Sequence, residues 1–262
     1  MHATASAAKE GPVIEAVGLS HAYEGPTGWK KALDQFQLTV SKNEFLCVLG
    51  PSGCGKSSFL RMLAGLMRPL GGSLLVNGNE IKGPGLDRAI VFQEAALFPW
   101  LTVVRNVMFG LEMAGWPKAR AEQRAMDVLK IVGLADSAEN YPYQLSGGMR
   151  HRVAVARAWS LQDAAVLLMD EPFSAIDAIN RMALQDHLVQ TWMAEPRTVV
   201  YVTHDVEEAV TLASRVIILT PSPGRIVADH KIDLPWPRNR DAPEFNRLKA
   251  DLTERMRSTS AH

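Results

Sequence analysis

The chain has 262 residues, 47% of them hydrophobic, which is enough for one large domain or two small ones around a substantial core. Its 28 basic and 28 acidic side chains give a formal net charge of zero, which argues against a dedicated nucleic-acid-binding protein. Two cysteines, Cys47 and Cys54, are too few for a disulfide framework or a zinc cluster and fit a reducing cytosol.

The predicted elements begin after a short N-terminal segment. Residues 1–12 are small and polar, so we expect a flexible tail rather than a signal peptide. Apolar β-rich runs then alternate with helical patterns, which favours an α/β fold with a largely parallel sheet. All these runs are far shorter than the roughly 20 residues of a transmembrane helix, so we expect any membrane role to depend on a partner. The expected strands are Val13–Leu19, Phe36–Val40, Phe45–Leu49, Ile90–Phe92, Val166–Met169, Val199–Val202 and Val216–Leu219.

Two further features divide this pattern. Ser73–Val76 and Glu80–Ile81 flank Asn77-Gly78, which predicts a hairpin with a type I′ turn because both turn residues tolerate positive φ. Strand patterns then stop over residues 100–160, which predicts a helical insertion. Its expected helices are Val103–Ala114, Lys118–Val132 and Gly148–Ser160.

The C-terminal part returns to the α/β pattern. A strand is expected after Gly224, then a proline-rich turn at Leu234-Pro235-Trp236-Pro237. Asp241-Ala242-Pro243-Glu244 has the character of a capping box and predicts the start of a last helix. Residues 258–262 are expected to form a short tail.

A glycine-rich motif follows the expected strand Phe45–Leu49 and precedes a helical pattern. It matches G-x-x-x-x-G-K-[ST], in which glycines let the backbone wrap around phosphate oxygens and N–H groups point at the anion. Lys56 can reach the β- and γ-phosphates, and the Ser57 hydroxyl is placed to bind Mg²⁺. The alternative, an ordinary strand-to-helix turn, fits the flanking elements less well. The motif comprises Gly50, Pro51, Ser52, Gly53, Cys54, Gly55, Lys56 and Ser57.

An acidic pair, Asp170-Glu171, ends the expected strand Val166–Met169. In a parallel sheet, residues at the carboxyl end of a strand face the same crevice as the phosphate-binding loop. Asp170 is predicted to hold Mg²⁺ through water, and Glu171 to orient and polarise the attacking water. Without a phosphate-binding loop in the same chain, a surface turn would be an equally good interpretation of this pair.

Leu145-Ser146-Gly147-Gly148-Met149 precedes a basic helix and resembles the LSGGQ signature of ABC ATPases. The resemblance extends over residues 13–257 and implies a single ABC ATPase domain. That domain has a P-loop NTPase fold with a mainly parallel sheet, an antiparallel β subdomain and a helical insertion. The resemblance also implies a homodimer, in which Ser146, Gly147 and Gly148 of one subunit close over the ATP held by the other. A flexible Ser-Gly-Gly hinge is the alternative.

The remaining family positions are filled. Tyr23 stands where the family stacks an aromatic ring on adenine, with His21 and Trp29 as weaker candidates, and Ser58 replaces a common threonine after the loop. Gln93 corresponds to the residue that senses Mg²⁺ and the nucleophilic water and couples to the membrane partner.

The last two motifs follow the acidic pair. Asp177 ends Ser174-Ala175-Ile176-Asp177, which resembles the D-loop with Ile in place of Leu. His204 corresponds to the switch histidine that contacts the γ-phosphate. Met149 replaces the glutamine of the commonest signature and removes no group to which we assign a chemical role, so the resemblance implies an active ATPase that uses ATP and Mg²⁺.

Finer features resemble the nitrate, sulfonate, taurine and bicarbonate importer branch. This branch implies two transmembrane permease subunits, an extracytoplasmic substrate-binding protein and a peripheral location on the cytoplasmic face of the inner membrane. The segment Glu94–Trp100 is a candidate groove for a partner's coupling helix, with core packing as an equal alternative. The branch features are Ile81-Lys82-Gly83-Pro84-Gly85, Leu97-Phe98-Pro99-Trp100-Leu101-Thr102, Met149 and Leu234-Pro235-Trp236-Pro237-Arg238.

Other classes stay open. Importers of pyrimidine precursors share much of the pattern. A non-transport ABC ATPase acting on DNA or ribosomes is disfavoured, because the sequence has neither sustained heptads nor a second ATPase unit. An exporter subunit is disfavoured by the branch features.

Overall fold

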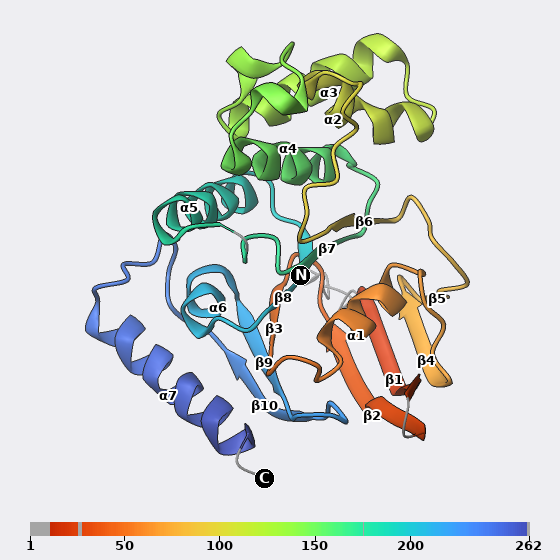
Figure 1. Cartoon of the computed structure of the whole chain (residues 1–262), viewed down its shortest axis with the longest axis vertical. Helices are drawn as coiled ribbons and strands as arrows, with labels where there is room; N and C mark the ends of the chain where they lie inside the picture. Colours follow the sequence, from red (N-terminus) through yellow and green to blue (C-terminus); the bar gives the residue numbers. More distant parts are fainter. Residues whose placement is uncertain (1–10, 26–27, 175, 261–262) are drawn as a thin grey trace, which may run out of the picture.

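The computed structural model describes residues 11–25, 28–174 and 176–260. The predicted tail of residues 1–12 therefore lies almost wholly outside the described residues, as does Ala175 of the predicted D-loop. Figure 1 shows an α/β body with a second sheet on one side and a group of helices at the top. In the part of the chain that the structure describes, no helix has the length and apolar character needed to cross a membrane.

The body is built on a six-stranded sheet in the order β10-β9-β3-β8-β7-β6. Neighbouring strands are parallel except for the β10–β9 pair. Every residue of the two central strands, β3 and β8, is buried, as expected for a parallel sheet covered on both faces. The strands are β3 (Phe45–Leu49), β6 (Arg88–Val91), β7 (Val166–Asp170), β8 (Thr198–Thr203), β9 (Arg215–Leu219) and β10 (Ile226–Lys231).

The second sheet is antiparallel, with the order β2-β1-β4-β5. Its strands are β1 (Ile14–Gly25), β2 (Gly28–Val40), β4 (Gly71–Val76) and β5 (Asn79–Glu80). The predicted type I′ turn is confirmed, because Asn77 and Gly78 have φ of 49° and 72°. Helix α1 (Lys56–Leu63) packs its buried Phe59 and Leu60 into the core that the two sheets share.

The helical insertion is confirmed. Helices α2 (Val103–Met113), α3 (Lys118–Ile131) and α4 (Gly147–Ser160) lie at the top of Figure 1 and coincide closely with the predicted segments. Their shared interior includes the fully buried Leu111 and Trp159. Helix α4 contacts β6 and α5, so it joins the insertion to the body.

Three more helices cover the body. The sequence did not delimit α5 (Ala178–Ala194) or α6 (Val206–Leu212), while the last helix, α7 (Pro243–Ser260), begins where the capping pattern predicted it. Helix α7 continues three residues into the segment that we expected to be a tail. It packs against α6 and β9 and buries Phe245 and Leu252.

Candidate functional site

The loop between β3 and α1 is shaped by its glycines. Gly53 and Gly55 have φ of 78° and 100°, in the left-handed region that glycine adopts without steric cost. A Cβ atom on Gly55 would lie 2.6 Å from the carbonyl oxygen of Ala32 in β2. The loop therefore lies against the antiparallel sheet as closely as its backbone allows, and no other residue fits at position 55.

Lys56 is the cationic group of this loop. Its side chain is buried, and its Nζ donates to the carbonyl oxygens of Gly50 at 2.7 Å and Pro51 at 2.9 Å. Cys54, also buried, lies 3.9 Å from the same Nζ through its Sγ, and burial raises the pKa of its thiol. The predicted phosphate-binding lysine is thus held in place by carbonyl groups of its own loop.

A cavity of about 390 Å³ opens over the loop. Tyr23, which is 41% exposed, forms one wall, and its hydroxyl is 2.9 Å from the Ser58 Oγ. The sequence did not single out Lys30 and Lys31, although the pairing of Tyr23 with Lys30 in the β1–β2 hairpin brings them here. The cavity is lined by Tyr23, Lys30, Lys31, Ala32, Ser52, Gly53, Gly55, Lys56, Ser57, Ser58, Glu171 and Ser222.

Ser57 and Asp170 meet beside the cavity. The Ser57 hydroxyl donates to the Asp170 Oδ1 at 2.9 Å. Burial raises the pKa of Asp170, and the bond from Ser57 opposes that shift. Within the described ranges, no three His, Cys, Asp or Glu side chains gather into a metal-binding cluster. Two hard oxygen ligands suit Mg²⁺, which usually keeps several waters and binds substrate phosphates besides one or two carboxylates.

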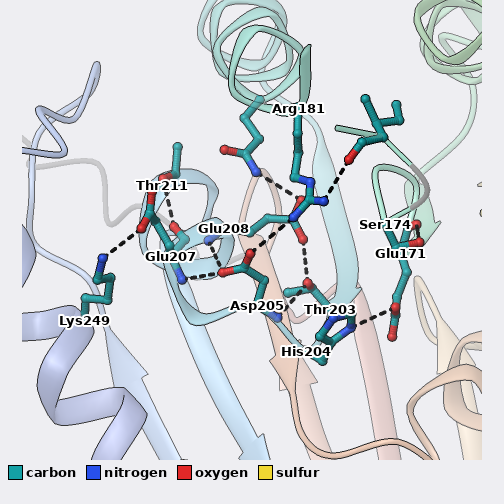
Figure 2. A network of polar contacts seen from close by, with 12 residues as sticks. Glu171, Ser174, Arg181, Thr203, His204, Asp205, Glu207, Glu208, Thr211 and Lys249 are labelled. Atoms are coloured by element: carbon teal, nitrogen blue, oxygen red, sulfur yellow. Dashed lines mark hydrogen bonds and ion pairs between the residues drawn. The ribbon is translucent and has the colours of Figure 1, made fainter. Parts of the chain in front are cut away.

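Glu171 and His204 also meet, at the ends of the adjacent strands β7 and β8. The His204 Nδ1 lies 2.9 Å from the Glu171 Oε2 (Figure 2). Glu171 has a φ of 44°, a conformation that costs a non-glycine residue free energy and clusters at functional sites. The Glu171 N–H donates to the Val202 carbonyl at 3.0 Å and anchors the turn to β8. The sequence placed both residues at one sheet edge but did not predict their contact.

Several predicted site residues lie apart from the cavity. Gln93 is exposed and lies two residues after the end of β6. Val91, the last residue of β6, pairs with Met169 of β7, so Gln93 follows a strand that ends close to the end of β7. Ser146 and Gly147 are exposed at the start of α4, where the Ser146 Oγ accepts from the Met149 N–H at 3.2 Å. Asp177 is exposed and caps α5. None of these residues, nor Gly148, lines the cavity described above.

The segment Glu94–Trp100 has a mixed character. Leu97 packs against the core, and the buried side-chain amide of Asn106 bonds to both the N–H and the carbonyl of Phe98. Trp100, in contrast, is 70% exposed. Core packing therefore fixes the segment, and an aromatic ring remains on its surface.

Comparisons with known proteins agree with this geometry. A family model described as "ABC transporter" matches residues 33–174. An uncharacterised ABC transporter ATP-binding protein of Methanocaldococcus jannaschii is 53% identical over 215 residues, which cover 82% of this chain and 80% of that protein.

Two relatives with named cargo are somewhat less similar. The aliphatic sulfonates import ATP-binding protein SsuB of Bacillus licheniformis is 44% identical over 87% of this chain and 88% of its own length. The taurine import ATP-binding protein TauB of Pseudomonas entomophila is 43% identical over 84% of each chain. Among solved structures, a dimeric bacterial ABC transporter cassette superposes with a TM-score of 0.72 at 28% identity, covering 86% of this chain and 99% of that one.

Proposed function

The chain belongs to the ABC transporter family and is an ATP-binding ATPase, and we propose that it energises an importer of a small anion. One observation supports the enzymatic part: Lys56, Ser57 and Glu171 line one cavity, with Asp170 bonded to Ser57 and His204 in contact with Glu171. The importer reading rests on the relatives named for sulfonate and taurine import. Among the nitrate, sulfonate, taurine and bicarbonate classes, those names favour sulfonates, taurine included.

The proposed chemistry assigns one role to each group. Glu171 orients and polarises a water that attacks the γ-phosphorus, and the bond to the β–γ bridging oxygen breaks to give ADP and phosphate. Lys56 binds the β- and γ-phosphates, and His204 holds Glu171 and contacts the γ-phosphate. Mg²⁺, bound by Ser57, Asp170 and Gln93, would neutralise phosphate charge. Tyr23 stacks on the adenine ring beside the Lys30–Lys31 wall.

The proposed assembly is a homodimer with two shared ATP sites. Ser146, Gly147 and Asp177 are exposed and do not line their own chain's cavity, which supports a role toward the ATP of the second subunit. Two permease subunits and an extracytoplasmic substrate-binding protein complete the importer. The ATPase subunits lie on the cytoplasmic face of the inner membrane, and the exposed Trp100 contacts a permease coupling helix.

Uptake in a strain that lacks only this chain tests the proposal. Growth on aliphatic sulfonates, taurine, nitrate or bicarbonate is measured with each compound limiting in turn. We expect one sulfonate-class uptake to be lost, restored by the wild-type chain and by the surface control Glu254→Gln, but not by Glu171→Gln. Normal uptake of all four would contradict the anion importer and favour a pyrimidine-precursor importer or a non-transport ATPase.

Purified protein tests the catalytic assignment separately. Glu171→Gln keeps the size of the side chain and removes its basicity, so turnover should fall by roughly 10²–10⁴. ATP binding and ATP-driven dimerisation should persist. Unchanged turnover would exclude Glu171 as the general base without bearing on the cargo.

A further inference from the structure

We propose that Glu208 is a positioning residue that holds His204 against Glu171 by fixing the backbone on both sides of the histidine. The inference rests on the proposed roles of His204 and Glu171 and does not depend on the cargo. Neither the glycine-rich motifs nor the acidic pair pointed to Glu208, which follows His204 in the first turn of α6.

Glu208 is a buried acid with defined partners. It is 5% exposed, its Oε2 accepts from the Thr203 hydroxyl, and its Oε1 accepts from the Gln185 Nε2 at 3.2 Å. Burial raises the pKa of this carboxyl, and the bonds from Thr203 and Gln185 oppose the shift. An apolar side chain would fill such a position without the desolvation penalty of a carboxyl group. The hydrogen bonds of Glu208 therefore point to a purpose other than packing.

Those bonds reach the backbone around His204. Thr203, the preceding residue, uses its Oγ1 both to donate to Glu208 and to accept from the Asp205 N–H at 3.1 Å. Asp205, the following residue, accepts from the Glu207 and Glu208 N–H groups at 2.8 Å and 3.3 Å. Figure 2 shows this closed set of contacts between the end of β8 and the start of α6.

A second element braces the same turn. Arg181 of α5 lies 3.7 Å from the Asp205 carboxylate and donates to the Ile176 carbonyl at 2.8 Å. The His204 side chain is itself 57% exposed, and the contact described for it is the one to Glu171. The position of the His204 side chain therefore depends on the conformation of its backbone. Glu208 is the buried group whose hydrogen bonds hold that backbone in place.

The effect on catalysis follows from where the other groups lie. Tyr23 and Lys56, which are proposed to bind ATP, belong to β1 and α1 and make no described bond to Glu208. Loss of the Glu208 contacts should misplace His204 while ATP binding stays intact. A displacement of about 1 Å at a reacting group can cost roughly 10²-fold in rate. The expected change is in kcat, with KM nearly unchanged.

Steady-state ATPase kinetics of the purified full chain test this with matched variants. Glu208→Gln and Thr203→Val should each lower kcat by roughly 10- to 10²-fold. Thr203→Ser keeps the hydroxyl and should stay near wild type. Glu207→Gln, which alters the neighbouring acid and its surface pair with Lys249, is the control and should leave kcat unchanged.

A His204→Ala background separates positioning from general destabilisation. If Glu208 acts through His204, Glu208→Gln should cause little further loss there. An undiminished kcat in Glu208→Gln, or the same fold-loss with and without His204, would overturn the inference. A full rate in His204→Ala alone would overturn the proposed role of His204 together with this inference. If a thermal unfolding measurement shows that Glu208→Gln is not folded, the comparison of Thr203→Val with Thr203→Ser tests the inference instead.

Discussion

The chain starts two helices with glycine-rich segments, and the two starts differ in what surrounds them. At α1, the left-handed Gly53 and Gly55 place the loop against β2, and the buried Lys56 faces a walled cavity. At α4, Ser146 caps the helix and, like Gly147, is exposed to solvent. The local physics is shared, because free N–H groups at a helix start favour an anion in both places.

The difference lies in the number of groups that the chain itself supplies. The start of α1 has a cation, an adjacent carboxylate pair and an aromatic wall, which suffice to recognise a nucleoside triphosphate. The start of α4 has the Ser146 hydroxyl, backbone N–H groups and the exposed Arg150, which donates to the Leu145 carbonyl, and Ser146 and its two glycines do not line the cavity. A helix start that does not line the phosphate-binding cavity of its own chain can contact a bound phosphate only where a second surface supplies the other binding groups. The comparison therefore supports the proposed homodimer, in which the catalytic unit is larger than one chain.

The largest effect is expected from a substitution that obstructs the N-terminus of α4. Ser146→Arg removes the cap and places a long side chain over the proposed shared contact. Losing preorganised donors at a reacting phosphate costs roughly 10²–10³ in rate, so we expect ATP hydrolysis near background. Equilibrium binding of ATP to the variant should stay close to wild type, because the α1 cavity is untouched. Full-rate hydrolysis by this variant as a homodimer would contradict the shared site.

The reciprocal change removes the cation at the α1 start. Lys56→Ala deletes the charged donor, and hydrogen bonds to charged groups contribute about 1.5–3 kcal/mol, so ATP affinity should fall by up to roughly 10². Binding is measured by isothermal titration with and without Mg²⁺. Lys42→Ala, in the turn between β2 and β3 and outside the cavity lining, is the matched control. Normal ATP affinity in Lys56→Ala would contradict the phosphate-binding assignment.

The smallest expected effect sharpens the assignment of the aromatic wall. Tyr23→Ala should weaken ATP binding by roughly tenfold, in line with base–aromatic stacking of about 1–3 kcal/mol. Tyr23→Phe removes the contact with Ser58 and keeps the ring, so it should bind almost as wild type. Equal losses in both variants would show that the hydroxyl matters rather than the ring.

Much of the fold was predictable from local pattern. The buried strands read as short apolar runs, and Asn77-Gly78 specified its own turn geometry. Strands β1 and β2 were predicted much too short and their pairing as a hairpin was not predicted, because irregular pairing between Ala16 and Ala22 disrupts the alternation of side chains along β1. Polar residues such as Lys30 also gave the first half of β2 no apolar strand pattern. For this reason Lys30 and Lys31 were not predicted to line the cavity.

The site was predictable where a motif fixes the backbone. Lys56, Ser57, Asp170 and Glu171 sit on strand ends or a helix start, so parallel strand order alone brings them together. Glu208 could not be found in this way. Charged side chains are rarely buried without partners, and its partner Thr203 lies on a different element. The tight turn at His204–Asp205, capped by Asp205, brings the two together, and no motif signals that turn.

The left-handed backbone at Glu171 has a consequence for the history of this chain. Glycine would relieve a local cost of about 1 kcal/mol at that position, because it adopts positive φ freely. Under the proposed role of Glu171 as general base, selection for stability and selection for turnover therefore oppose each other at this one position. A chain evolved or designed only to withstand heat would be expected to lose this carboxylate early, and it would keep its shape as it lost its chemistry.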